Sequence, residues 1–183
     1  MITHHNNNHR RPHRRGLGLA EAMISLTIAA TLLTAVSAAF NASSQAMKVN
    51  DDFFRSTQAA RVSLARILTQ VRTGAVDEAS TANNLHLITN SGQDLTYMLV
   101  AESDPAKGPM RLVMVNNTTG QTYDLARNVT TAIGTNSPFA IELGQDYNNA
   151  VCVSRVSMGI AVKVGSNEVR LSGSAAPRRN LTY

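Results

Sequence analysis

The distribution of apolar and polar side chains divides the chain into three parts. Residues 1–15 carry almost no apolar side chains, residues 17–40 are apolar except for Glu21, and later residues mix the two kinds. At about 1.5 Å rise per residue, a helix over residues 17–40 would be roughly 36 Å long, enough to cross the ~30 Å hydrocarbon core of a bilayer. The pattern predicts a membrane-spanning helix over residues 17–40.

The helical pattern continues beyond this segment. Residues 41–73 contain neither proline nor glycine, and their apolar side chains recur three, four or seven positions apart, which is typical of one buried helical face. Gly74, preceded by Arg72, is the predicted end of the helix. The whole helix would contain about 55 residues, with an amphipathic second half over residues 41–74. The predicted buried stripe consists of Val49, Phe53, Ala60, Leu64, Ile67, Leu68 and Val71.

After Gly74 the apolar side chains alternate with polar ones, as in antiparallel strands that bury one face. Residues 75–84 are small and polar and are predicted to be a connection. The longest alternating run predicts a central strand over residues 152–164. The predicted fold class is α+β, with a long N-terminal helix packed on an antiparallel sheet. The predicted strands are residues 85–89, 95–102, 110–116, 121–124, 139–143, 152–164 and 169–172.

Glu21 is the only charged side chain within the apolar segment. A charged side chain costs about 2.5–3.5 kcal/mol at the centre of a membrane helix, and somewhat less near its end. If the chain is cut after Gly16, Leu17 gains a free amine four residues before Glu21, on the same helix face. We expect the amine of one chain to pair with Glu21 of a staggered neighbour, which would set the register of assembly.

The order of arginines, Gly16, Leu17 and a glutamate five places after the glycine resembles the type IV prepilin cleavage and methylation motif. The resemblance implies that a prepilin peptidase cuts after Gly16 and methylates the amine of Leu17. It also implies that Glu21 is the assembly glutamate. The chain departs from the usual pattern because phenylalanine is common in place of Leu17, threonine is common in place of Gly18, and the apolar segment lacks proline.

Further short segments are similar to J-type minor pseudopilins of type II secretion and to W-type minor pilins. They are Leu64-Ala65-Arg66, residues 124–129 around Arg127, and residues 171–180, which end in a proline, two arginines and an asparagine. The resemblance implies a pilin-like fold and a minor pilin or pseudopilin, a structural subunit rather than an enzyme. The expected partners are prepilin peptidase, other pilins or pseudopilins and inner-membrane lipid. Type II secretion, type IV pili and DNA uptake remain open.

The charge distribution predicts how the chain is oriented. The 17 basic and 12 acidic residues give a net charge of +5, and removal of four leader arginines, with no leader acid, leaves 13 − 12 = +1. The basic leader, residues 1–16, favours a cytoplasmic leader and a periplasmic C-terminal domain, residues 75–183, on a single-pass inner-membrane protein. We expect no nucleic-acid binding by the mature domain, which lacks a basic patch interleaved with aromatic side chains.

An ordinary signal peptide is the main alternative. The small residues around Ser37 and Ala38 resemble a signal-peptidase site, and cleavage there would release a small β-rich binding domain. The apolar run is, however, longer than the 7–15 residues usual for a signal core, and Glu21 is unusual within one.

We identify no catalytic constellation and no cofactor or metal site in the sequence. His86, the only histidine beyond the leader, is predicted to be structural and to lie on a strand. Cys152 is the only cysteine and is predicted to be a small buried side chain in a strand. The segment that begins at Asp146 is interpreted as a polar turn, although its oxygens leave Ca²⁺ binding open.

Overall fold

The computed structural model describes residues 18–103, 109–131, 137–145 and 148–178. Gly16, Leu17 and Asp146 therefore lie outside the described residues. The chain divides into two compact units, residues 1–45 and residues 46–183.

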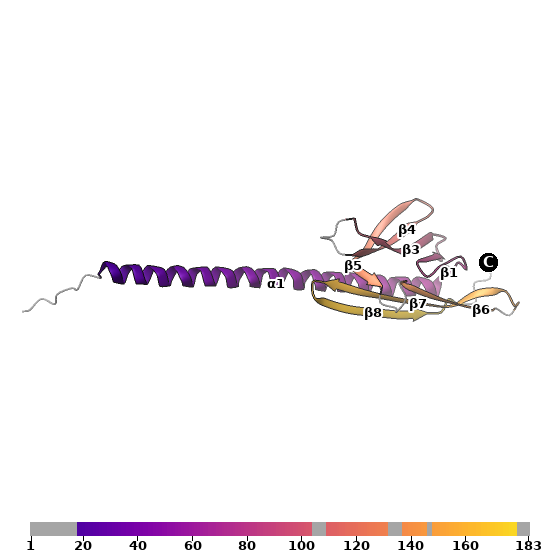
Figure 1. Cartoon of the computed structure of the whole chain (residues 1–183). Helices are drawn as coiled ribbons and strands as arrows, with labels where there is room; N and C mark the ends of the chain where they lie inside the picture. Colours follow the sequence, from indigo (N-terminus) through magenta and orange to yellow (C-terminus); the bar gives the residue numbers. More distant parts are fainter. Residues whose placement is uncertain (1–17, 104–108, 132–136, 146–147, 179–183) are drawn as a thin grey trace, which may run out of the picture. The chain divides into compact units, whose positions relative to one another are not determined.

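One helix, α1 (Leu19–Thr73), contains 55 residues, as the apolar pattern predicted. The helix extends through both units. In the second unit its C-terminal part packs on an antiparallel sheet of eight strands (Figure 1). The strands are β1 (Ala75–Val76), β2 (Asn84–Ile88), β3 (Asp94–Ala101), β4 (Met110–Asn116), β5 (Gln121–Thr131), β6 (Phe139–Gln145), β7 (Val151–Val164) and β8 (Asn167–Ala175). The fold is α+β with one long helix on an antiparallel sheet, in agreement with the predicted class.

The strand order is β1-β2-β3-β4-β5-β7-β6, and β8 pairs with β7. Strand β7 is central, as its length predicted, because it pairs with β5, β6 and β8. Its inward residues alternate as expected: Val156, Met158, Ile160 and Val162 are fully buried. The next residue of the alternation, Val164, is only half-buried.

The core lies between the C-terminal part of α1 and the sheet. The helix contributes the predicted Ala60, Leu64, Ile67, Leu68 and Val71, and Phe53 packs against their edge. Val49 is a correction to the predicted stripe, since 40% of it is exposed. Ser63 is buried although it is polar, because its hydroxyl donates to the carbonyls of Ala59 (2.7 Å) and Leu125 (3.2 Å).

The helix ends where predicted. Gly74 does not have the left-handed backbone conformation that is common for a glycine after a helix, and it is required because its backbone lies close to two carbonyl oxygens. A Cβ at this position would lie 2.5 Å from the carbonyl oxygen of Ile88 and 2.9 Å from that of Gln70. The absence of a side chain lets the chain pass directly into β1, which pairs with β2 through Ala75 and Val76. Strand β1 therefore corrects the prediction that residues 75–84 are only a connection.

Strand β5 is also longer than predicted, since residues 125–131 continue it beyond Asp124. Its first part pairs with β4 and its last three residues pair with β7. Within the pairing with β4, the register shifts between Arg127 and Val129, so that Asn128 has no partner residue on β4. Asn128 has a φ of 57°, and its side-chain amide donates to the Ser56 hydroxyl of α1 at 3.1 Å. This β-bulge interrupts the alternation on which the prediction was based.

Candidate functional site

The head of α1 is the candidate site. Among the residues named from the sequence, the structure describes Glu21, whereas Gly16 and Leu17 lie outside the described residues. Glu21 is in the first turn of α1, and the carbonyl of Gly18 accepts from the backbone N–H groups of Glu21 (2.9 Å) and Ala22 (3.1 Å). The carboxylate therefore lies at the positive end of the helix dipole, where a negative charge is favoured.

The Glu21 side chain is exposed. Within the described part of the chain, no hydrogen bond or ion pair to its carboxylate is formed. Glu21 is therefore exposed in the first turn of α1, and the pairing of its carboxylate with the amine of Leu17 stays a prediction.

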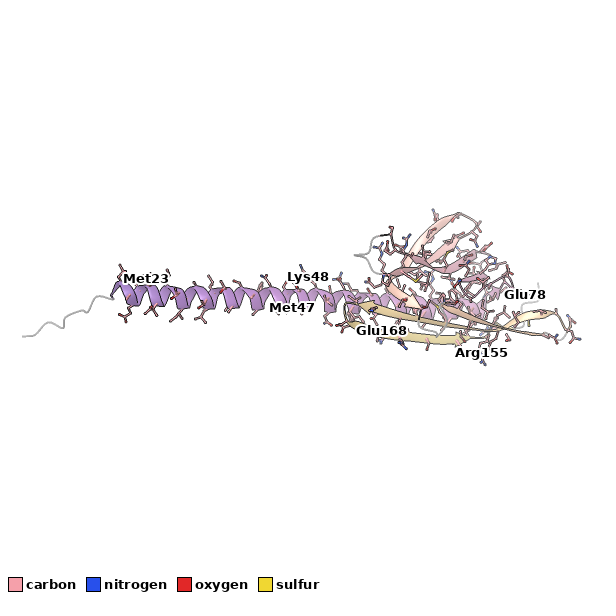
Figure 2. All side chains as sticks on the ribbon, in the orientation of Figure 1. Met23, Met47, Lys48, Glu78, Arg155 and Glu168 are labelled. Atoms are coloured by element: carbon pink, nitrogen blue, oxygen red, sulfur yellow. The ribbon has the colours of Figure 1, made fainter. Side chains whose placement is uncertain are left out.

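The apolar part of α1 is uncovered by any described side chain. Its large side chains stand out around the helix, with Met23 as one example (Figure 2). Leu26 is 73% exposed and Phe40 is 75% exposed, which is unusual for such side chains in contact with water. An 18-residue window of this helix has a mean hydropathy of 1.9 and none of it is buried. The helix is long and apolar enough to cross a membrane, in agreement with single-pass insertion.

Four hydroxyl groups of this segment are satisfied within the helix. Ser25 donates to the carbonyl of Glu21 at 2.8 Å, and the hydroxyls of Thr27, Thr31 and Thr34 donate to carbonyls three or four residues earlier. In hydrocarbon an unsatisfied polar group is costly, so such bonds permit these residues in a membrane helix. Their small side chains also allow close approach of a second helix.

Two other residues singled out from the sequence lie in the second unit, far along the chain from Glu21. His86 lies on β2, as predicted, and contacts two aspartates that sequence reasoning did not connect with it. Cys152 lies on β7 but is only half-buried, which corrects the prediction of a buried side chain. Among the described residues, no group of three or more histidine, cysteine, aspartate or glutamate side chains is placed to hold a metal ion.

The network around Tyr97 was also missed. Its hydroxyl donates to Gln70 Oε1 and contacts Met114 Sδ at 3.3 Å. The side chain of Gln70 is half-buried. Burial raises the pKa of Tyr97, although nearby Arg66 and the hydrogen bond to Gln70 oppose this effect. The network is structural and contributes no further candidate residue to the site.

Comparison of the chain with protein-family models, with curated proteins and with solved structures found no match.

Proposed function

We propose that this protein is a minor pilin or pseudopilin, a structural subunit of a type IV pilus-like or type II secretion fibre. The observation that supports this most is the uncovered apolar part of α1, whose single charged residue, Glu21, lies in the first turn of the helix. The sequence Arg14-Arg15-Gly16-Leu17 immediately precedes this helix, in the order of a prepilin processing site.

In this proposal the basic leader stays in the cytoplasm and the second unit is periplasmic. Prepilin peptidase cuts after Gly16 and methylates the new amine of Leu17. The subunit then leaves the inner membrane when its apolar helix packs against helices of other pilins or pseudopilins. Glu21 pairs with an N-terminal amine during this transfer, so that neither charge remains unpaired in an apolar environment.

The surface of α1 is compatible with this packing. Small side chains are distributed along the exposed apolar part of the helix, where they would let a neighbouring backbone approach closely. The next charged side chain after Glu21 is that of Lys48, 27 residues further along the helix and next to Met47 (Figure 2). At about 1.5 Å rise per residue, the uncharged interval is roughly 39 Å long, enough to span the hydrocarbon core.

A second candidate is a secreted β-rich binding domain released by cleavage near Ser37 or Ala38. It is favoured by one observation: the buried core of the second unit begins at Ala60, with Phe53 at its edge, so such cleavage would leave that core intact. It gives no role to Glu21 or to the Arg-Arg-Gly-Leu sequence, and we therefore prefer the first candidate.

The proposal is tested by replacing Glu21 in cells that contain the remaining fibre subunits. We expect Glu21→Ala to be inserted and cut as the wild type is, because the residues at the scissile bond are unchanged. Its amount in the purified fibre fraction should fall at least roughly tenfold, since the loss of about 1.4 kcal/mol of pairing energy changes an equilibrium tenfold.

Ser25→Ala is the matched control, because it removes a small polar group one turn further along the same helix. We expect this variant to reach the fibre at wild-type levels. Glu21→Gln keeps the size and hydrogen-bonding capacity of the side chain and should fail as Glu21→Ala does. Recovery of either Glu21 variant in fibres at the wild-type level would contradict the pairing mechanism.

A further inference from the structure

The most unusual polar contact in the second unit is a histidine between two carboxylates. His86 Nδ1 lies 2.7 Å from Oδ2 of Asp77, and His86 Nε2 lies 2.6 Å from Oδ1 of Asp94. An ionised carboxylate only accepts hydrogen bonds, so each ring nitrogen must carry a proton to bond with its partner. The geometry therefore fits the imidazolium form of His86, in which both nitrogens donate.

The cluster joins segments that are separate in the sheet. Asp77 directly follows β1, His86 lies on β2 and Asp94 is the first residue of β3. From the turn after β4, the Asn117 side-chain amide donates to Asp94 Oδ1 at 2.6 Å and to the Thr96 hydroxyl at 2.9 Å. His86 is thus at the centre of a polar network that reaches from the end of β1 to the turn after β4.

The segment after β1 is held by a short strand pairing and by hydrogen bonds of one turn. Strand β1 pairs with β2 through only two residues, Ala75 and Val76. In the turn that follows, the Asp77 N–H donates to the His86 carbonyl (3.0 Å), the Ser80 N–H donates to the Asp77 carbonyl (3.0 Å) and the Thr81 N–H donates to the Asn84 carbonyl (2.8 Å). The Ser80 hydroxyl also bonds to the main chain of His86. Glu78, in this turn, is exposed at the surface (Figure 2). Such a short pairing opens at little cost unless side chains reinforce it.

The charged groups that face His86 are Asp77, from the segment after β1, and Asp94, from β3. Partial burial lowers the pKa of His86, but its bonds and charge interactions with Asp94 and Asp77 outweigh this effect and leave the pKa raised. The pKa of Asp77 is lowered by the Ala79 N–H and by His86. The pKa of Asp94 is lowered by the amide of Asn117 and by His86.

We propose that Asp77, His86 and Asp94 form a pH-sensitive clamp that fixes the segment connecting the long helix to the sheet. While His86 is charged, both aspartates are held and residues 75–81 stay on β2. When His86 loses its proton, one ring nitrogen presents a lone pair to a carboxylate, and that contact becomes repulsive. The segment after β1 is then released while the core strands remain paired. The clamp is independent of the assembly role proposed above.

The pH range follows from the direction of each shift. The raised pKa of His86 means that its stabilising contribution is complete below the ordinary histidine value of about 6.5 and is lost as pH rises through the pKa in the folded state. The lowered pKa values of the aspartates mean that their contribution is present above about 3.8 and is lost at lower pH. The clamp should therefore be closed between about pH 4 and 6.5 and should open toward alkaline pH.

The first measurement is the titration of His86 in the full chain in detergent micelles, followed by NMR of ¹³C-labelled histidine. Replacing His4, His5, His9 and His13 with glutamine leaves His86 as the only histidine and removes ambiguity of assignment. We expect a pKa above the ordinary value of about 6.5. A pKa at or below that value would overturn the proposal.

The second measurement is hydrogen–deuterium exchange of residues 75–81 as a function of pH, corrected for the intrinsic rate. We expect their protection to fall roughly fivefold as His86 deprotonates, the size expected for one charge-assisted hydrogen bond at a partly exposed site. Residues 156–164 of β7 should show no such change. Equal pH dependence of the two segments would overturn the proposal.

Variants distinguish the clamp from a purely structural histidine. Asp94→Asn and Asp77→Asn keep an oxygen acceptor but remove the charge, and each should lower the pKa of His86. His86→Gln should abolish the pH step in exchange. Asp51→Asn is the matched control, because Asp51 pairs with Arg55 on α1 at 2.9 Å and should leave His86 unaffected. An unchanged pKa of His86 in both asparagine variants of the cluster would contradict the clamp.

Discussion

At the scale of single residues, a few positions have a role that depends on an unusual environment. Glu21 is a carboxylate within an apolar helix, and His86 is a histidine between two carboxylates. Gly74 is a glycine whose missing Cβ lets two backbone segments approach closely. The sequence predicted the helix end at Gly74, which is confirmed, whereas the role of Glu21 stays a prediction. The aspartates around His86 could not be identified, because Asp77 and Asp94 meet only after β1, β2 and β3 pair.

We predict that Gly74→Ala destabilises the second unit by about 1–3 kcal/mol, the usual cost of forcing an extra methyl group into a packed site. The added Cβ would lie 2.5 Å from the Ile88 carbonyl oxygen, which belongs to the backbone and cannot rotate away. Guanidinium-induced unfolding of the full chain in detergent, followed by tyrosine fluorescence, measures this cost. Gly18→Ala has open space around its Cβ and should be neutral. Equal stability of the two variants would contradict the close approach at Gly74.

At the scale of elements, apolar periodicity was sufficient for α1 and for most strands. Strand β4 has the predicted bounds, and the alternation over β7 correctly identified its buried face. The prediction was wrong at β1 and at the second half of β5. Strand β1 is too short to show a period, and β5 has a bulge at Asn128, where a positive φ breaks the alternation. Both errors arise from tertiary pairing, which local patterns do not contain.

The two faces of α1 in the second unit should differ sharply in their tolerance of substitution. Ile67 is fully buried against the sheet, whereas Val62 is 63% exposed on the same helix. We expect Ile67→Ala to lower the free energy of unfolding by about 2–5 kcal/mol and Val62→Ala to change it by less than about 0.5 kcal/mol. Guanidinium unfolding of both variants checks this difference. Similar losses from the two substitutions would show that the helix does not pack on the sheet through the face described.

At the scale of the whole molecule, the chain combines an uncovered apolar helix with a unit that has its own core. The buried positions begin at Ala60 on α1, and residues 19–45 contribute none of them. The apolar segment is therefore not required for the core, and its composition must be explained by an environment outside the described residues. A lipid bilayer is an environment that explains the apolar surface. The bundle of similar helices proposed above would in addition give Glu21 a partner.

The most direct test of the central claim is the identity of the N-terminal residue of the protein isolated from cells that contain a prepilin peptidase. Intact-mass measurement and N-terminal sequencing determine it together. The proposed function predicts a chain that starts at N-methylated Leu17 and a Gly16→Leu variant that retains the leader. A chain that starts near Ala38 or Ala39, or an uncut chain that starts at Met1, would contradict it.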